Sequence, residues 1–344
     1  MAAKIEKKKL IILALYQNVG KFFNQEFYNE IRTVLPQYKC EVRSPSLWTD
    51  EEILKLVADA DILFGAHISK ELVEAGKKLK MIQSPGTGVD KIDVDAAAER
   101  GIPVCTATGF NAVWVAEHAI SLMMALAKKV SLFDNELKNG IWNPVPTQKL
   151  QGKTLGIIGL GSIGVEIAKR MKPFGMRILA IKRTANSTDK IPEVDFLGEP
   201  PDLIHVMSES DYLVLSVVST PDTAGIIGAK EIAAMKKTAF LVNVSRSEIT
   251  NEKALIQALR EGQLAGAAFD VFSEEPVAHD NPLLHLPNVI LTPHVGGGGG
   301  SMESGRERIS FFVENFSRVA RGDPPLNVVD SRLKYVVSRS LKKS

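Results

Sequence analysis

The sequence predicts an α/β protein of two domains, each built on a parallel β-sheet. Short apolar runs alternate with amphipathic stretches, a pattern typical of parallel strands joined by crossover helices. The length of 344 residues is enough for about two domains, each with its own core. A glycine-rich turn also opens the second of two such blocks, where a strand would pass into a helix.

The first block predicts a flavodoxin-like domain. Its expected strands are 10–16, 40–43, 61–65, 81–83 and 103–105, and its expected helices are 24–35, 50–60 and 70–79. A helical pattern at 302–320 has no strand partner in the second block, so we expect it to return to the first domain. That domain would comprise residues 1–108 and 300–344 and would be discontinuous in sequence.

The second block, residues 109–299, predicts a Rossmann-type doubly wound sheet. Its six expected strands are 156–158, 177–181, 212–217, 240–244, 266–270 and 289–292, which match a complete dinucleotide-binding unit. Residues 113–129 are apolar on nearly all sides, so this helix is expected between layers or at a homodimer contact.

Composition and charge exclude several classes of protein. The 42 basic and 40 acidic residues balance, so neither a nucleic acid nor a membrane surface is the expected partner, and a small molecule is favoured. Two cysteines without a CxxC pair argue against a disulfide scaffold or a thiolate metal site and favour a cytoplasmic location. The apolar run at 10–16 is too short for a signal peptide and better fits a buried first strand. No metal site is predicted.

The glycine-rich turn has the spacing GxGxxG, at Gly159, Gly161 and Gly164. The first glycine permits the tight turn, the second lets a pyrophosphate approach the backbone, and the third lets the helix pack closely on the strand. The helix N-terminus also attracts phosphate charge. Because an apolar run precedes the turn and a helical pattern follows it, the segment predicts dinucleotide binding.

The end of the next strand indicates which dinucleotide is bound. An NAD enzyme would place a carboxylate there for the ribose hydroxyls, whereas this chain has Lys182, Arg183 and Thr184. Two cations and a hydroxyl suit the 2′-phosphate of NADP. The alternative is that both cations are solvated loop charges in an NAD enzyme.

Three further polar residues follow the ends of predicted strands: Arg246, Glu275 and His294. The carboxyl ends of parallel strands meet at the ligand crevice, so these side chains can converge although they are far apart in sequence. An arginine, a carboxylate and a histidine beside a nicotinamide form a coherent set for hydride-transfer chemistry.

With these motifs the chain resembles the D-isomer-specific 2-hydroxyacid dehydrogenases, which include glyoxylate/hydroxypyruvate reductases and phosphoglycerate dehydrogenases. The resemblance covers nearly the whole chain. Besides the glycine turn and the three motifs above, it rests on Gly86-Thr87-Gly88-Val89-Asp90 and Ala116-Glu117-His118. It implies a substrate domain made of the two terminal segments, a coenzyme domain between them, and an active site in the cleft.

The resemblance also implies roles for individual residues. Arg246 would hold the substrate carboxylate and carbonyl oxygen, His294 would be the general acid in reduction, and Glu275 would pair with His294. Backbone amides near Thr87 and Gly88 would receive the carboxylate. The positions that would line the cofactor are Ser162, Ile163, Val217, Val218, Val244, Asp270 and Gly297.

The sequence departs from the family pattern in places. Ser247 stands where glycine is common and Thr250 where an aspartate often follows. Five consecutive glycines at 296–300 suggest a hinge that would suit domain closure. Of the other histidines, His118 in the apolar helix is interpreted as a buried, hydrogen-bonded residue, and His67 as a weaker substrate-contact candidate.

The leading functional hypothesis is NADPH-dependent reduction of a small 2-oxo acid to the D-2-hydroxy acid. A phosphoglycerate dehydrogenase is disfavoured for two reasons. The segment that ends at His67, after the expected strand 61–65, has no arginine where those enzymes usually have one, and no room remains for a regulatory domain. Formate dehydrogenases of this family pair the histidine with a glutamine. The glutamate at position 275 therefore disfavours formate dehydrogenase activity. A dinucleotide-sensing corepressor that retains this fold and the same three residues stays an alternative.

Overall fold

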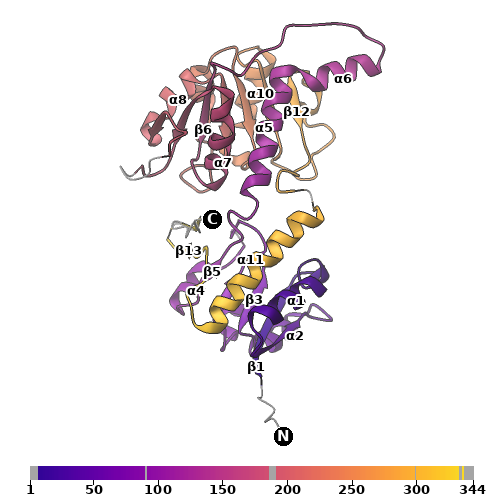
Figure 1. Ribbon diagram of the computed structural model, residues 1–344, viewed down its shortest axis with the longest axis vertical. Coiled ribbons are helices and arrows are strands. Elements are labelled where there is room, and N and C mark those ends of the chain that lie inside the picture. Colours follow the sequence, from indigo (N-terminus) through magenta and orange to yellow (C-terminus); the bar gives the residue numbers. More distant parts are fainter. Residues whose placement is uncertain (1–6, 90, 186–190, 299, 333–334, 337–344) are drawn as a thin grey trace. The chain divides into compact units, whose positions relative to one another are not determined.

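The computed structural model describes residues 7–89, 91–185, 191–298, 300–332 and 335–336. It divides the chain into two compact units (Figure 1). Unit 1 combines Met1–Phe110 with Gly300–Ser344, and unit 2 is Asn111–Gly299. The first division falls after Phe110 rather than after residue 108. The assignment of one unit to substrate and the other to cofactor stays a prediction.

Unit 1 contains a five-stranded parallel sheet in the order β2-β1-β3-β4-β5. Its strands are β1 (Lys8–Leu15), β2 (Tyr38–Arg43), β3 (Ile62–Gly65), β4 (Met81–Gln83) and β5 (Val104–Cys105). Its helices are α1 (Gln25–Val34), α2 (Asp50–Val57), α3 (Lys70–Ala75), α4 (Val94–Glu99) and α11 (Met302–Arg321). The return of the C-terminal helix to the first domain is therefore confirmed.

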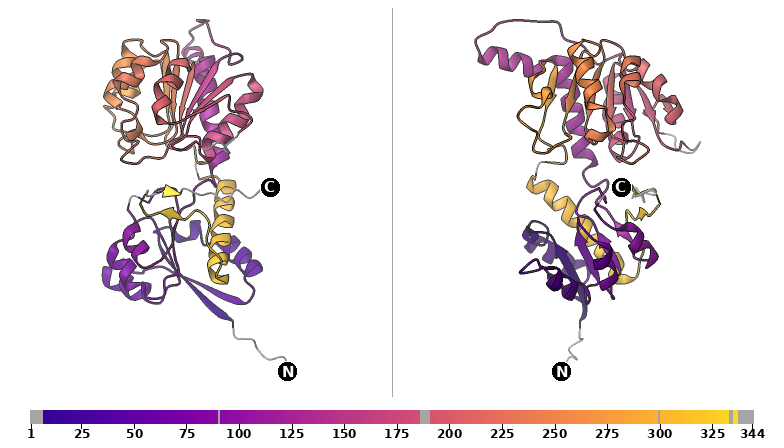
Figure 2. Two further views of the ribbon diagram at one scale, coloured as in Figure 1. Left: turned by 90° about the vertical axis from the view of Figure 1, so that its left-hand side faces the viewer. Right: turned by 180° about the vertical axis from the view of Figure 1, so that it is seen from behind.

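Helices cover both faces of this sheet (Figure 2). On one face, Phe27 of α1 and Phe312 and Phe316 of α11 pack with the buried side chains of β1 and β3. On the other face, Val57 of α2 and Val73 of α3 belong to a second apolar cluster. The strands are buried on both faces, which explains their nearly continuous apolar sequences.

Unit 2 contains a seven-stranded parallel sheet in the order β12-β11-β10-β9-β6-β7-β8. Its strands are β6 (Thr154–Ile158), β7 (Arg177–Ile181), β8 (Phe196–Gly198), β9 (Tyr212–Leu215), β10 (Phe240–Asn243), β11 (Gly266–Phe269) and β12 (Val289–Leu291). Its helices are α5 (Ala112–Lys128), α6 (Val130–Lys138), α7 (Ser162–Met171), α8 (Leu203–Glu209), α9 (Ala229–Ala234) and α10 (Glu252–Arg260).

The sheet of unit 2 is doubly wound. α5 and α7 pack on one face, and α8, α9 and α10 pack on the other. From β6 the chain moves outward through β7 and β8, then returns to β9 on the other side and continues to β12. The strand order therefore reverses between β6 and β9. In sheets of this kind ligands bind at such a switch point, beyond the carboxyl ends of the strands.

The structure differs from the expected elements in four places. The six-residue helix α4 lies at Val94–Glu99, where no helix was predicted. The predicted six strands are seven, because the edge strand β8 has only three residues and too short an apolar run to be recognised. α6 follows α5 directly after Lys129, whose φ of 53° breaks the helix. A short antiparallel pair, β13 (Val329–Asp330) and β14 (Tyr335–Val336), lies beyond α11. Among the helices of the described ranges, none is long and apolar enough to span a bilayer.

Candidate active site

The glycine turn joins β6 to α7 at the switch point of unit 2. Gly159 has φ of 103°, and a Cβ built there would lie 2.6 Å from the backbone nitrogen of Val217, which follows β9. A Cβ on Gly164 would lie 2.5 Å from the carbonyl oxygen of Gly159. Gly161 precedes the first helical residue, and Ser162 and Ile163 form the first turn of α7. Side chains are thus excluded from the tight turn and the helix–strand contact.

The turn fits a dinucleotide phosphate for two reasons. The first N–H groups of α7 have no acceptor within the helix and face the carboxyl edge of the sheet, where the helix dipole is positive. The missing Cβ atoms leave backbone as the surface that a ligand would meet. A pyrophosphate binds to this combination of free N–H groups and close backbone approach.

The three residues that were predicted to select the dinucleotide come directly after β7. Lys182 is half-buried, and Arg183 and Thr184 are exposed. The N–H of Lys182 donates to the carbonyl of Gly198 at 3.0 Å, which ties this end of β7 to β8. Glu199, just past β8, accepts a hydrogen bond from the N–H of Ala185 at 2.9 Å. The segment therefore contains two cations, and one carboxylate lies beside it, just past the adjacent strand.

The other predicted cofactor-lining positions lie at strand ends of the same sheet. Val217 and Val218 follow β9, and Val218 is 51% exposed. Val244 follows β10 and is buried in the core beneath α5. A Cβ on Gly297 would lie 3.1 Å from the side-chain amide of Asn111. Gly159 and Val217 lie next to each other at the switch point of this sheet.

Glu275 and His294 meet, although they lie on separate loops. The Nδ1 atom of His294 is 2.7 Å from Oε2 of Glu275, and Oε1 of Glu275 accepts the N–H of Phe272 at 3.1 Å. A carboxylate accepts here, so Nδ1 carries the proton and the ring orientation is set. Within the described ranges no hydrogen bond uses Nε2 of His294, and its side chain is 46% exposed. That atom is therefore available to exchange a proton with a ligand.

The backbone of His294 is in the left-handed region, with φ of 51°. This conformation is uncommon for a residue with a side chain and persists only where the surroundings enforce it. The carboxylate of Asp270 supplies that enforcement on both sides of His294. It accepts hydrogen bonds from the hydroxyl of Thr292 at 2.7 Å and from the N–H groups of Val295 at 2.9 Å and Gly296 at 2.8 Å.

Asp270 is also contacted by α5. Nε2 of His118 lies 3.3 Å from Oδ1 of Asp270 and 2.9 Å from the hydroxyl oxygen of Thr292. Both neighbours can accept, because the Thr292 hydroxyl already donates to Asp270, so Nε2 of His118 carries a proton. The interpretation of His118 as a hydrogen-bonded residue is confirmed, but its side chain is only partly buried, with 19% exposed. A Cβ on Gly296 would lie 2.8 Å from Oδ2 of Asp270, which explains a glycine there.

The electrostatics of Asp270 follow from these contacts. Burial opposes ionisation, but the hydrogen bonds from His118, Thr292 and the two backbone N–H groups outweigh it, so the pKa of Asp270 lies below its ordinary value. Asp270 is 3% exposed and remains ionised. Its carboxylate thus acts as a buried acceptor for two segments of unit 2, α5 and the loop after β12.

Arg246 follows β10 on a turn organised by Asn243. The fully buried side chain of Asn243 donates to the carbonyl of Arg246 at 2.9 Å and accepts from the N–H and hydroxyl of Ser245 at 3.0 and 2.9 Å. The guanidinium of Arg246 donates to the carbonyl of Ser245 at 2.7 Å. In the described part of the chain, no hydrogen bond or ion pair joins Arg246 to Glu275 or His294.

The predicted carboxylate-binding loop belongs to unit 1, where it follows β4. Thr87 and Gly88 are exposed. The loop is held by Ser84, whose hydroxyl donates to the carbonyl of Gly88 at 3.0 Å, and by the N–H of Ala107, which donates to the carbonyl of Gly86 at 2.8 Å. These contacts leave the N–H groups near Thr87 at the carboxyl edge of the unit 1 sheet.

Sequence reasoning did not assign the roles of Asn243, Thr292 and the Asp270–His118 contact. Asn243 and Thr292 were visible only as part of the motifs that contain Arg246 and His294. The position of Asp270 was predicted from the resemblance, but as a cofactor contact and not as the acceptor that holds the turn of His294. A polar residue near the end of a predicted strand was the available signal.

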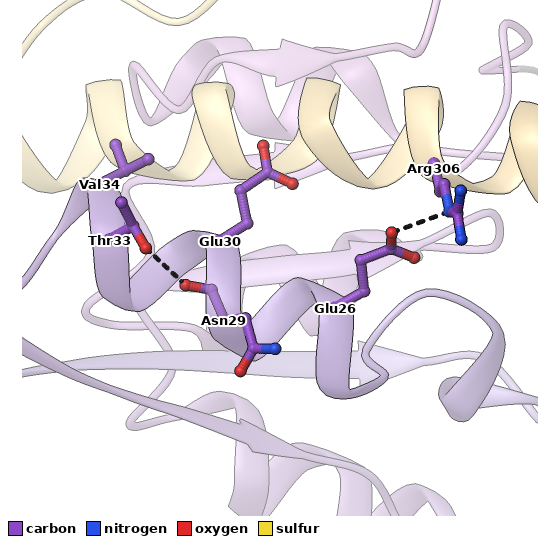
Figure 3. A pocket seen from close by; sticks show the side chains of 6 residues that line it. All are labelled: Glu26, Asn29, Glu30, Thr33, Val34 and Arg306. Atoms are coloured by element: carbon purple, nitrogen blue, oxygen red, sulfur yellow. Dashed lines mark hydrogen bonds and ion pairs between the residues drawn. The ribbon is translucent and has the colours of Figure 1, made fainter.

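A pocket of about 570 Å³ lies between α1 and α11 of unit 1 and contains no predicted site residue (Figure 3). Its lining includes Glu26 and Glu30, and Glu26 forms an ion pair with Arg306 at 3.0 Å. Two carboxylates make this pocket a poor fit for an anionic substrate. The chemistry of Glu275 and His294, rather than cavity size, therefore identifies the candidate site.

Comparisons with known proteins agree with this geometry. The family model described as "D-isomer specific 2-hydroxyacid dehydrogenase, NAD binding domain" matches residues 120–296. The chain is 40% identical to a D-3-phosphoglycerate dehydrogenase of Methanocaldococcus jannaschii over 84% of its own length, but spans only 55% of that protein. It is 38% identical to a glyoxylate reductase of Korarchaeum cryptofilum, over 83% of this chain and 90% of that protein.

The chain is also similar to a solved structure. An NADPH-dependent glyoxylate/hydroxypyruvate reductase from Sinorhizobium meliloti, in complex with NADP and malonate, has a TM-score of 0.74 and 26% identity. The match covers 98% of this chain and all of that one. The chain therefore belongs to the D-isomer specific 2-hydroxyacid dehydrogenases, a family of nicotinamide-dependent oxidoreductases.

Proposed function

We propose that the protein reduces a small 2-oxo acid, of the glyoxylate or hydroxypyruvate type, to the D-2-hydroxy acid, with NADPH as the favoured cofactor. The observation that carries this proposal is the pair formed by Glu275 and His294. The carboxylate holds the proton on Nδ1 and leaves Nε2 of an oriented, half-exposed imidazole available for a ligand. This is the arrangement that general acid catalysis by histidine requires.

The residues divide the reaction between them. A reduced nicotinamide cofactor, when held by the glycine turn of Gly159, Gly161 and Gly164, would supply the hydride for the carbonyl carbon of the substrate. His294 donates a proton from Nε2 to the carbonyl oxygen, so the product is the neutral alcohol. Arg246 binds the substrate carboxylate and carbonyl oxygen through its planar fork of donors, and N–H groups near Thr87 and Gly88 bind the carboxylate. Asp270 keeps the turn of His294 in place.

The reaction is tested by initial-rate reduction of glyoxylate, hydroxypyruvate, pyruvate and phenylpyruvate, each with NADPH and with NADH, followed by nicotinamide absorbance. We expect turnover of the smaller acids. The absence of turnover for every acid, in the presence of measurable cofactor binding, would contradict the proposal and favour the dinucleotide-sensing alternative.

The preference for NADPH rests on Lys182, Arg183 and Thr184 at the end of β7. Cations and a hydroxyl at this place suit a 2′-phosphate, whereas the carboxylate of Glu199, just past β8, opposes it. Replacing Lys182 with Asp together with Arg183→Ala should shift the ratio of kcat/KM for NADPH and NADH toward NADH by about 10- to 100-fold. An unchanged ratio would mean that other residues read the phosphate.

A homodimer is proposed for unit 2. α5 is mostly buried against the sheet of its own unit, so it does not itself require a partner. Exposed apolar side chains lie further along the chain, in α6 (labelled in Figure 1) and the segment after it. There Leu137 and Ile141 are exposed and Trp142 is 85% exposed. A second copy covering this surface would explain these side chains. Light scattering should give a dimer that Trp142→Ser together with Ile141→Ser weakens, and a monomeric wild type would contradict it.

A further inference from the structure

Two fully buried amide side chains meet in unit 1, Gln83 at the end of β4 and Asn315 on α11. Both are 0% exposed, and 232 residues separate them in sequence. Nδ2 of Asn315 donates to Oε1 of Gln83 at 2.8 Å. Burial of an amide is costly unless its donors and its acceptor are paired. The other partners of these two side chains show what the pair connects.

Asn315 holds the part of the chain that follows α11. Its Oδ1 accepts the N–H of Leu326 at 2.7 Å, and its Nδ2 also donates to the carbonyl of Leu326 at 3.2 Å. The next residue, Asn327, accepts the N–H of Thr106 at 3.2 Å, and its side-chain amide donates to the carbonyl of Thr108 at 2.6 Å. The segment after α11 is thus bonded both to the helix and to the chain that follows β5.

Gln83 extends the contact to the predicted carboxylate-binding loop. Its Nε2 donates to the carbonyl of Ser84 at 2.9 Å and to that of Cys105 at 3.3 Å. The hydroxyl of Ser84 then bridges the loop, because it donates to the carbonyl of Gly88 at 3.0 Å and accepts the N–H of Gly86 at 3.3 Å. Ser84 is 1% exposed, whereas Gly88 is exposed. A continuous series of hydrogen bonds therefore runs from α11 to the exposed tip of the loop.

The tip carries the N–H groups of Thr87 and Gly88, for which no residue of the described ranges provides an acceptor. Hydrogen bonds weaken steeply as they depart from linearity, so these donors bind a carboxylate well only if their directions are fixed. The carbonyl of Gly86 accepts the N–H of Ala107 at 2.8 Å. Because a peptide group is planar, this bond also fixes the N–H of Thr87. Ser84 holds the peptide groups on either side of the tip.

We propose that Ser84, Gln83 and Asn315 are positioning residues, which set the directions of the N–H groups of Thr87 and Gly88 for the substrate carboxylate. This inference rests on the proposed function of the loop. The three side chains are buried, so they act on the substrate through the loop backbone. A fully paired buried network fixes one geometry, which apolar side chains in the same space would not do. Substrate affinity thereby depends on α11 and the segment after it.

The first test compares KM with kcat. Gln83→Met keeps a side chain of similar length and removes the amide that donates to Ser84. KM for glyoxylate and hydroxypyruvate should rise by about tenfold, the effect of a misaligned hydrogen bond to a charged group. The carboxylate is bound in both ground and transition states, so kcat should stay within about threefold of the wild type. KM for the cofactor should not change, because the glycine turn belongs to unit 2.

Ser84→Ala is the milder second variant, because it removes one hydroxyl from the same network and leaves the packing in place. It should raise KM for the same acids by a similar factor, again with little change in kcat. Thermal unfolding shows which variants are folded. An unchanged KM in Ser84→Ala, or in folded Gln83→Met, would overturn the proposal.

Tyr38→Phe is the matched control on the other edge of the sheet. The hydroxyl of Tyr38, in β2, donates to the carbonyl of Ala320 near the end of α11 at 2.5 Å. The variant removes a contact between the sheet and α11 that does not involve the loop, so it should lower the midpoint of thermal unfolding and leave KM unchanged. An equal rise of KM in Tyr38→Phe and Gln83→Met would mean that general loosening of α11 causes it, and would overturn the proposal.

The effects of Gln83 and Asn315 should also be coupled. Asn315→Ala should raise KM, because Gln83 then loses the donor that orients its amide. Both changes together should raise KM by less than the product of the separate factors, since the two residues belong to one network. Separate factors that multiply would contradict the assignment of Asn315.

A binding measurement distinguishes failure of this inference from failure of the proposed function. Oxamate has a carboxylate next to an unreactive carbonyl, so calorimetric titration of the complex with reduced cofactor needs no turnover. Binding about tenfold weaker in Gln83→Met and Ser84→Ala, but not in Tyr38→Phe, would support the inference even if no 2-oxo acid were reduced. Equal binding in all three variants and the wild type would overturn it, even if the wild type reduces 2-oxo acids.

Discussion

Two charged side chains, one in each unit, have opposite surroundings. Asp270 in unit 2 is 3% exposed, and its two oxygens accept from a hydroxyl, an imidazole and two backbone N–H groups. Arg308 in unit 1 lies between two aromatic rings, and its buried Nε has no acceptor. A buried charge is stable when the protein supplies its partners, and costly when it does not.

The difference lies in the partners that each unit provides. Asp270 uses its charge inside the fold, where it joins the left-handed turn of His294 to His118 in the second turn of α5. Nε of Arg308 has no hydrogen-bond partner among the described residues of unit 1. Removal of Asp270 should therefore affect stability and every substrate.

The largest loss of activity is expected from His294→Ala. It sets the upper limit for the loss of kcat that any other change in the turn around His294 can cause. Removal of the general acid should lower kcat by about 10²- to 10⁴-fold. Cofactor binding, measured by nicotinamide fluorescence, should stay nearly intact because the glycine turn after β6 is unchanged. Comparable kcat in the variant would remove His294 from the mechanism.

Asp270→Asn should have the next largest effect. Val295 and Gly296 donate to different oxygens of Asp270, so an asparagine leaves at least one N–H group facing an NH₂ group. The free energy of unfolding should fall by about 1 to 3 kcal/mol, the cost of an unsatisfied buried group. We expect kcat to fall by roughly tenfold for all substrates, less than in His294→Ala, because the imidazole remains but is less well positioned. Urea unfolding and steady-state rates measure both effects.

The pH dependence of the free energy of unfolding shows whether the ionised carboxylate of Asp270 stabilises the fold. Its pKa is lower in the folded protein than the ordinary value of about 3.9, so ionised Asp270 stabilises the fold fully above about pH 4. The stability advantage of the wild type over Asp270→Asn should shrink as the pH falls through the lower, folded-state pKa.

Asp195→Asn is a matched control, because Asp195 also accepts a backbone N–H, that of Ile178 at 2.7 Å. This variant should reduce stability without changing kcat. Equal stability and kcat of Asp270→Asn and wild type would contradict the assigned role.

Much of the fold followed from patterns that are local in sequence. Buried parallel strands read as continuous apolar runs, so the five strands of unit 1 and six of the seven in unit 2 were predicted near their observed positions. β8 was missed because it is short and lies at the edge of the sheet. α6 was missed because only one residue, Lys129, lies between the end of α5 and the start of α6, and its backbone angle alone separates the two helices.

From the residues alone, the candidate site was predictable only where one physical constraint determines which residue a position can hold. Gly159 and Gly164 could be assigned because a side chain there would collide with backbone, which the structure shows at 2.6 and 2.5 Å. The Asp270 contacts could not be predicted, because their donors come from α5 and from the loop after β12 and meet only in the folded sheet. Arg308 was equally hidden, since nothing in the sequence of α11 distinguishes it from the paired Arg306.

The smallest effect is expected just beyond the turn that Asp270 holds, where the contacts of that carboxylate end. Gly298 has φ of 96° and donates its N–H to the carbonyl of Val295 at 3.0 Å, and residue 299 lies outside the described ranges. Gly298→Ala should cost about 1 to 2 kcal/mol of stability, because a side chain disfavours this backbone conformation. If the glycine run is a hinge for closure, kcat and KM should also change together by a few-fold. Calorimetric unfolding and steady-state kinetics of this single variant separate the two effects. Lower stability with unchanged kcat and KM would mean that the glycines only permit the local backbone conformation. The functional part of the loop would then end at Gly296, the last residue bonded to Asp270.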